Sequence, residues 1–296
     1  MTGSAALAVL AALLYGLSDF WTGLASRALR VASASRLNYS VAAVVMLLAL
    51  ACTGGAWSTA AILWGSAAGV FALIGLLAFY AAMATGPMSV ASPLIAVLES
   101  TVPVAVALTI GEHLVWWAWL AIAAAIAAGV LLAADRTRTS MRISRRTVLL
   151  AIIAGGTLGL SVVALNAAPK AARFIPGVCE TLVGLIALLA VSVVSYARGQ
   201  TRSRPAKSET VNNRDPGQPR HGALLAAIGG ALLGAANTAL ILALHSGNLA
   251  IVGVLVSLYP VATIFLARLV LKERLTLVQA AGAILALFAA AALALT

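Results

Sequence analysis

Long apolar segments alternate with short polar ones along almost the whole chain. An apolar segment of about 20 residues is long enough to cross a lipid bilayer as an α-helix. Ten segments meet this requirement: 4–24, 37–54, 60–84, 87–110, 114–134, 147–168, 174–196, 222–245, 248–271 and 276–295. The pattern therefore predicts an all-α membrane protein with ten transmembrane helices.

Basic residues are distributed very unevenly among the segments that separate the spans. If the chain crosses the membrane at every span, 17 of its 19 Lys and Arg residues fall on one side. Only Lys170 and Arg173 fall on the other side. Because short basic loops stay in the cytoplasm, the rich side is predicted to be cytoplasmic and both termini extracytoplasmic. The net charge of +11 then reflects membrane topology, and we expect no binding to nucleic acid.

The composition excludes a soluble globular protein. Hydrophobic residues make up 62% of the chain and charged residues 9%, whereas a soluble domain has about 25% charged residues. We therefore expect a multi-pass protein of the cytoplasmic membrane, surrounded by lipids, and the sequence is compatible with a homo-oligomer.

Enzyme signatures are missing from the sequence. There is no phosphate-binding loop, no nucleophile elbow and no His-Glu-x-x-His motif. The two cysteines, Cys52 and Cys179, both lie in apolar spans and are too few for a metal site or a disulfide framework. We expect neither catalytic residues nor a metal or other cofactor.

Two stretches of the chain share landmark residues at equal spacing. Gly86 and Gly247 each open an apolar span, and Glu112 and Glu273 follow 26 residues later in each case. The two acids thus lie in equivalent turns, each before the last span of a five-span half. Because five is odd, the second half enters the membrane upside down relative to the first. This is the inverted-repeat arrangement used for alternating access.

A second match supports the division into halves. Gly16-Leu17-Ser18 in the first span corresponds to Gly159-Leu160-Ser161 in the sixth. We therefore divide the chain into a first five-helix repeat, a basic cytoplasmic linker and a second five-helix repeat that includes the polar loop 198–221. Their bounds are 1–134, 135–146 and 147–296.

These features resemble the drug/metabolite transporter superfamily, EamA-type. The clearest stretch begins at Tyr259-Pro260 and continues through Lys272-Glu273-Arg274-Leu275, and the opening Tyr15-Gly16-Leu17-Ser18-Asp19-Phe20 is also similar to such proteins. The resemblance implies a ten-helix carrier with a central cavity lined mainly by spans 1, 3, 4, 6, 8 and 9. It implies more peripheral positions for the fifth and tenth spans. The first half departs from the pattern because Glu99 stands at the position equivalent to Pro260.

Three acids lie inside apolar spans, where an ionisable group is costly and is a candidate for function. Glu99 is at the centre of its span, where a carboxyl group could bind substrate or protons. It could instead be a structural, hydrogen-bonded residue beside Ser100 and Thr101. Asp19 could face the cavity or lie near the membrane boundary. For Glu180 we expect a structural ion pair at the outer rim with Lys170 or Arg173, because they are close in sequence.

Uncharged polar residues in the spans are further candidates for binding substrate. A tyrosine supplies an aromatic face and a hydroxyl group, and an asparagine supplies an amide. The alternatives are membrane-interface anchoring for the tyrosines and hydrogen bonds between helices for the asparagines. The candidates are Tyr15, Tyr80, Tyr259, Asn166 and Asn237.

The sequence favours a secondary active transporter that exports a small organic metabolite or drug by alternating access. Coupling to protons, or exchange for a second solute, is open at this point. Two alternatives also remain open, namely a flippase for a lipid-linked substrate and a non-transporting membrane scaffold or intramembrane enzyme. The substrate itself is not indicated.

Overall fold

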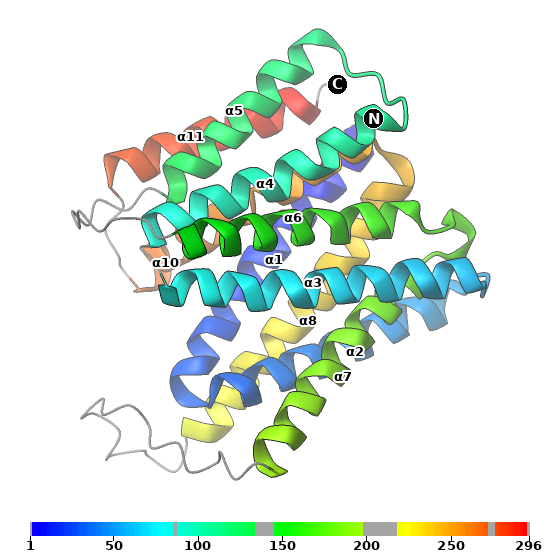
Figure 1. Ribbon diagram of the computed structural model, residues 1–296, viewed down its shortest axis with the longest axis vertical. Helices are drawn as coiled ribbons and strands as arrows, with labels where there is room; N and C mark the ends of the chain where they lie inside the picture. The colour runs from blue at the N-terminus through cyan, green and yellow to red at the C-terminus, as the bar shows by residue number, and fades with distance from the viewer. Residues whose placement is uncertain (1, 86–87, 134–144, 198–217, 272–275, 295–296) are drawn as a thin grey trace.

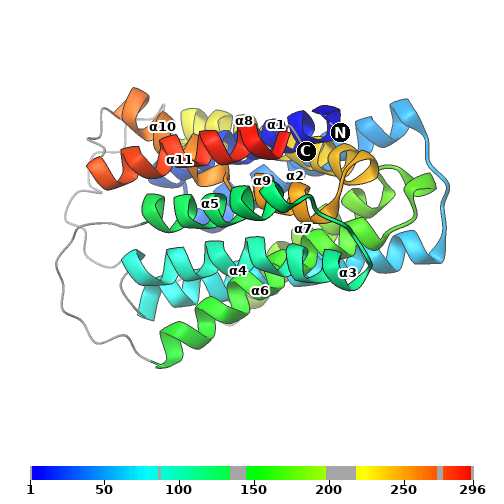
Figure 2. The same cartoon turned by 90° about the horizontal axis from the view of Figure 1, so that it is seen from above.

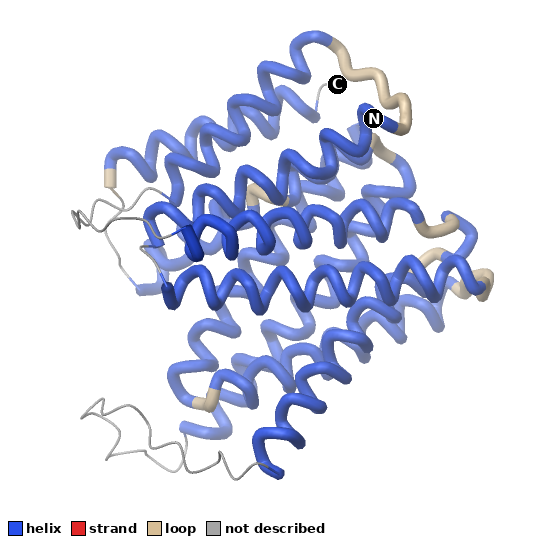
Figure 3. The backbone as a smooth tube through the Cα atoms, viewed as in Figure 1, coloured by secondary structure: helices blue, strands red, loops and turns tan. Residues whose placement is uncertain are grey.

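The computed structural model describes all residues except 1, 86–87, 134–144, 198–217, 272–275 and 295–296. Within the described residues all regular secondary structure is helical, as Figure 3 shows, which confirms the all-α part of the prediction. The helices are α1 (Thr2–Ala28), α2 (Val31–Thr53), α3 (Thr59–Thr85), α4 (Met88–Thr109), α5 (Trp116–Ala133), α6 (Arg145–Ala167), the short 3-10 helix η1 (Lys170–Ala172), α7 (Ile175–Ala197), α8 (Gln218–Ser246), α9 (Leu249–Val256), α10 (Tyr259–Leu271) and α11 (Leu277–Ala294).

Many of these helices have the length and apolar character of membrane spans. Six described helices, α1, α2, α3, α6, α7 and α8, are long and apolar enough to cross a membrane. Shorter apolar stretches lie in α4, α5, α9 with α10, and α11. Large apolar side chains such as Leu277 and Phe288 are 85% and 70% exposed. Extensive exposed apolar surface of this kind is expected where lipid covers the protein.

The predicted span 248–271 is two helices rather than one. α9 ends at Val256 and α10 begins at Tyr259, with a turn at Ser257 and Leu258 between them. Pro260 has no N–H group, so it cannot donate to the carbonyl of Val256 four residues earlier. In the first half the equivalent residue is Glu99, which keeps its N–H, and α4 continues through it without a break.

Eight helical segments form a ring in which each packs against the next. The order is α1, α8, α2, α7, α3, α6, α4 and α9, and α9 packs against α1 again. Figure 2 shows α1, α8 and α10 on one side of the molecule and α3, α4 and α6 on the other. α5 and α11 pack against each other at the edge of the molecule, as Figure 1 shows.

Glycines allow several of these helices to pack in close contact. A Cβ atom at Gly69 of α3 would lie 2.7 Å from Val183 Cβ and 2.8 Å from the Glu180 carbonyl oxygen on α7. A Cβ atom at Gly234 of α8 would similarly lie 2.6 Å from Val45 Cβ on α2. In a membrane, small residues at such contacts let the two backbones approach and gain van der Waals contact. Neighbouring helices in the wall of the cavity described below are therefore closely packed.

Glu112 connects the turn before α5 to the start of α9. Its Oε1 accepts a hydrogen bond from the Leu249 N–H at 2.8 Å, and its Oε2 accepts one from the Ala250 N–H at 3.3 Å. The first N–H groups of a helix have no partner within the helix, and a carboxylate there satisfies them. The landmark residues Gly86 and Glu273 lie outside the described residues, whereas Gly247 is packed against Ser4.

Helix ends next to the basic segments lie on one side of the molecule. They include the end of α5, the start of α6, the end of α7 and the start of α8. The start of α1 and the end of α11 lie on the opposite side (Figure 1). The predicted basic linker 135–146 falls largely outside the described residues, as does most of the loop 198–221.

Candidate functional site

A cavity of about 540 Å³ lies inside the helical ring. Its lining comes from α1 to α4 and from α6 to α10. Neither α5 nor α11 contributes a described lining residue, and α2 and α7 contribute more than the family resemblance implies. This volume is typical of a binding site for a small molecule.

The cavity brings together all three carboxyl groups that the sequence singled out within spans. Asp19 comes from α1, Glu99 from α4 and Glu180 from α7. Asp19 is exposed to the cavity, and Glu99 and Glu180 are partly buried. The structure thus places Asp19 at the cavity, one of the two positions that the sequence left open.

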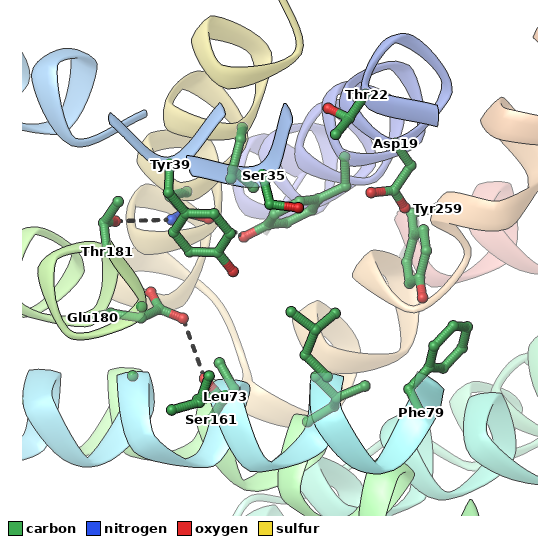
Figure 4. Close-up of a pocket in the computed structure, with 18 of the residues that line it drawn as sticks. Asp19, Thr22, Ser35, Tyr39, Leu73, Phe79, Ser161, Glu180, Thr181 and Tyr259 are labelled. Carbon is green, nitrogen blue, oxygen red and sulfur yellow. Dashed lines mark hydrogen bonds between the residues drawn. The ribbon is translucent and has the colours of Figure 1, made fainter. Parts of the chain in front are cut away.

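Helix periodicity explains why one face of α1 contributes several polar groups. Tyr15, Asp19, Thr22 and Ser26 follow one another at intervals of three or four residues and all line the cavity. Residues at this spacing lie on the same face of an α-helix. Figure 4 shows Asp19 and Thr22 on this face, with Tyr259 of α10 near Asp19.

Glu180 has one hydrogen-bonded and one unsatisfied oxygen. Its Oε1 lies 3.2 Å from Ser161 Oγ on α6 (Figure 4). Ser161 Oγ also lies 3.0 Å from the Ala68 carbonyl oxygen on α3. The Oε2 atom of Glu180 is buried and has no hydrogen-bond partner among the described residues. A buried polar atom without a partner is rare in proteins and calls for an explanation.

The Ser161 hydroxyl can accommodate both protonation states of Glu180. A hydroxyl group has one proton to donate and can also accept hydrogen bonds. When Glu180 is charged, Ser161 donates its proton to Oε1. When Glu180 is protonated, Ser161 can donate to the Ala68 carbonyl oxygen and accept from the carboxyl group. The site can therefore take up and release a proton without losing this contact.

The ion pair expected for Glu180 is not what the structure contains. Lys170 Nζ donates to the His245 carbonyl oxygen at 2.8 Å, and a guanidinium nitrogen of Arg173 donates to the Thr53 carbonyl oxygen at 2.9 Å. Glu180 lies five residues beyond the start of α7, about 7.5 Å further along the helix axis. Its side chain is turned into the cavity, so closeness in sequence did not predict its partner.

A chain of hydrogen bonds joins three walls of the cavity. The Tyr15 hydroxyl donates to Asn237 Oδ1 on α8, and Asn237 Nδ2 donates to Thr181 Oγ1 on α7 at 3.4 Å. Thr181 in turn donates to the Gly177 carbonyl oxygen. Asn237 thus acts as the expected link between helices while also lining the cavity.

The remaining candidates from the sequence occupy different positions. Tyr259 lines the cavity. Asn166 lies near the end of α6 and is not among the described lining residues. The Tyr80 side chain lies outside the described residues.

Sequence reasoning missed Tyr39 of α2, which also lines the cavity. A Cβ atom at Gly184 of α7 would lie 2.5 Å from its Cε1 atom, so the Tyr39 ring rests directly on that glycine. The only signal in the sequence was a polar aromatic residue within an apolar span. Among the described residues, no group of His, Cys, Asp and Glu has the geometry to hold a metal ion.

Comparisons with known proteins identify one family. A family model described as "EamA-like transporter family" matches residues 145–295. No curated protein matches the chain. A solved crystal structure of a protein matches 98% of this chain and 95% of its own chain, with a TM-score of 0.68 and 17% sequence identity. At this identity the likeness describes the fold alone.

Proposed function

The chain belongs to the EamA-like transporter family, and from this premise we propose that it is a secondary active transporter of a small organic solute. The solute would be exported across the cytoplasmic membrane by alternating access. The observation that carries the proposal is the cavity, because one space lined by three carboxyl groups is built from both halves of the chain. A scaffold or a purely structural protein would need no such space.

We propose that the transporter consists of two inverted five-helix repeats, residues 1–134 and 147–296. Reciprocal packing supports this arrangement. α1 packs along α8 as α6 packs along α3, and α2 packs against α8 as α7 packs against α3. The family model begins and ends close to the bounds of the second repeat. Alternating access would follow if the two halves rock around the cavity that they share.

The two Gly-Leu-Ser matches support the same relationship at atomic detail. Gly16 of α1 packs against α10 at Tyr259 and Ala262, and Gly159 of α6 packs against α4 at Glu99 and Val102. Gly16 and Gly159 are 143 residues apart, and the offset between the repeats grows to 161 residues after the long loop 198–221. Subtracting 161 from Tyr259 gives residue 98, next to Glu99. Equivalent glycines therefore contact equivalent parts of the two repeats.

The orientation follows from the basic residues. We propose that the side with the start of α6 and of α8 faces the cytoplasm, because 17 of the 19 basic residues would lie there. The start of α1 and the end of α11 would then face outside. A tag attached to either terminus tests this orientation. A membrane-impermeant reagent added outside intact cells should label the tag, and a tag that is labelled only after the cells are opened would contradict the orientation.

Proton coupling is the form of energy coupling that the site supports best. Asp19, Glu99 and Glu180 share one cavity, and the Ser161–Glu180 contact suits both protonation states of Glu180. In reconstituted vesicles, export would be driven by an imposed proton gradient. Asp19→Asn and Glu99→Gln would reduce it, and Asp215→Asn, in the segment between α7 and α8, is the matched control.

Alternating access can be tested without knowing the substrate. Leu73 lies midway along α3 and is one of the lining residues labelled in Figure 4. In a background of Cys52→Ser and Cys179→Ser, we expect Leu73→Cys to react with a membrane-impermeant thiol reagent from either side of the membrane. Each rate should change when the proton gradient is reversed. Reaction from one side only, at a rate that no gradient alters, would contradict alternating access.

A further inference from the structure

We propose that the cavity binds an organic cation that carries an aromatic or other apolar group. This inference deepens the proposed transport function and rests on it. It is carried by the charges of the lining residues, by the unsatisfied oxygen of Glu180 and by the aromatic wall next to that oxygen.

Among the described lining residues, every side chain that can carry a formal charge near neutral pH is an acid. Asp19, Glu99 and Glu180 line the cavity, and among its described lining residues there is no Lys, Arg or His. The cations closest in sequence to Glu180 are Lys170 and Arg173, which donate to backbone carbonyls of α8 and of the α2 end. An anionic solute would therefore meet negative charge with no compensating group, whereas a cation would be complementary to the cavity.

The Glu180 carboxyl group, which lines the cavity, locates the site proposed for the cationic group, and its Oε2 atom is the one that lacks a partner among the described residues. Oε2 is buried and has no donor in the described part of the chain, while Oε1 already contacts Ser161. A buried carboxylate oxygen without a donor lowers the stability of the folded protein, because the hydrogen bonds that it made with water are not replaced. An ammonium group of the solute would supply the missing charge and, in a primary amine, an N–H donor.

An aromatic ring lies next to this oxygen. Gly184 is four residues after Glu180, so both lie on one face of α7, and the Tyr39 ring rests on Gly184. Figure 4 shows the Tyr39 ring beside Glu180 at the edge of the open space. The face of an aromatic ring attracts a cation, and the attraction grows when water is excluded. A carboxylate and a ring on adjacent turns form a pocket for an ammonium group.

The rest of the cavity suits an apolar group of moderate size. Further aromatic side chains come from three other helices, namely Tyr15, Phe79 and Tyr259. Leucines complete the wall on α3 and α6. A volume of about 540 Å³ leaves room for one ring-bearing solute beyond the ammonium group.

The test compares probes that differ mainly in charge. Benzyltrimethylammonium and benzylammonium are cations, benzyl alcohol is neutral and phenylacetate is an anion. Dissociation constants would be measured by calorimetry on the purified full chain in detergent at neutral pH. We expect each cation to bind at least ~10-fold more tightly than benzyl alcohol or phenylacetate, as one charged contact provides. Phenylacetate binding as tightly as the cations would overturn the proposal.

Variants locate the site and control for folding. Glu180→Gln and Tyr39→Leu should each weaken benzyltrimethylammonium binding by ~10-fold. Tyr39→Phe keeps the ring, so its affinity for the cation should be almost that of the unchanged chain. The same is expected of Asp215→Asn, in the segment between α7 and α8. Cation affinity that is unchanged in Glu180→Gln would overturn the assignment of this pocket.

The inference and the proposed function can fail separately. If labelling of Leu73→Cys shows alternating access but no cationic probe binds, the transport function is supported and the inference of a cation site is wrong. If the cations bind in this pocket but access never alternates, the pocket is correctly assigned and the transport function falls.

Discussion

Gly159 of α6 lies directly against the backbone of Glu99 in α4. A Cβ atom at residue 159 would be 3.0 Å from the Glu99 carbonyl oxygen and 2.8 Å from Val102 Cβ. The contact sets the distance between the helix that carries Glu99 and the helix that carries Ser161. The spacing of these two helices in the cavity wall therefore depends on a residue that has no side chain.

This contact predicts that Gly159→Ala lowers stability although alanine favours helices more than glycine does. The added methyl group must displace α4, at a cost of about 1 to 3 kcal/mol in the free energy of unfolding. Gly156→Ala is the matched control, because a Cβ atom at residue 156 meets nothing within 4 Å. Thermal unfolding in detergent should show a lower midpoint for Gly159→Ala only. Equal midpoints for the two variants would show that α6 and α4 can separate without cost.

Glu112 is predicted to hold the start of α9 in place. Replacing it with alanine removes both acceptors from the N–H groups of Leu249 and Ala250, and should cost about 1 to 2 kcal/mol. Hydrogen exchange at these two amides should become faster. His113→Ala, at the exposed neighbouring residue, should leave the exchange unchanged. Unaltered exchange in Glu112→Ala would mean that α9 is held by packing alone.

The Tyr15 and Asn237 side chains are predicted to be energetically coupled. Tyr15→Phe removes the donor to the Asn237 amide oxygen. The resulting loss in the free energy of unfolding should therefore be larger when Asn237 is present than when it is replaced. In a double-mutant cycle with Asn237→Ala we expect a coupling of about 0.5 to 1.5 kcal/mol. The same cycle with Asn166→Ala should be additive, because Asn166 is not among the described lining residues. An additive result for Asn237 would mean that this hydrogen bond makes no measurable contribution to the free energy of unfolding.

Gly184 is predicted to control the aromatic wall beside Glu180. A Cβ atom there would lie 2.5 Å from Tyr39 Cε1, so Gly184→Ala must push the ring away from α7. We expect benzyltrimethylammonium to bind ~10-fold more weakly, which corresponds to about 1.4 kcal/mol. Gly156→Ala serves again as the control for an added methyl group. Unchanged affinity would mean that the ring does not contact the cation.

The predicted helices and the observed ones agree where local sequence dominates. The span predicted at 60–84 corresponds to α3, and that at 276–295 corresponds to α11. The break between α9 and α10 was not predicted, although Pro260 was noted. A proline can be absorbed in a helix as a kink or can end the helix, and the surrounding packing decides between these outcomes. Pro103, which lies inside the unbroken α4, shows the other outcome.

The candidate site could be predicted only in part. Asp19 and Glu99 were identified because a carboxyl group in an apolar span is costly unless it has a role. Glu180 was identified on the same ground but assigned to an ion pair, because sequence distance alone made Lys170 and Arg173 its nearest cations. Tyr39 was missed because its contact with Gly184 joins two helices far apart in the chain.

The sequence by itself determined that the chain is a helical membrane protein and which segments carry the basic charge. Both follow from local physics, since the thickness of the hydrocarbon layer sets the length of a span and charge is excluded from it. Only the tertiary structure decided which side chains share the cavity. Glycine and alanine occur along every span, and their contacts permit many pairings of helices. Packing selects one arrangement, in which Gly69, Gly159 and Gly184 each lie in close contact with a neighbouring helix. That arrangement brings the three carboxyl groups together in the cavity.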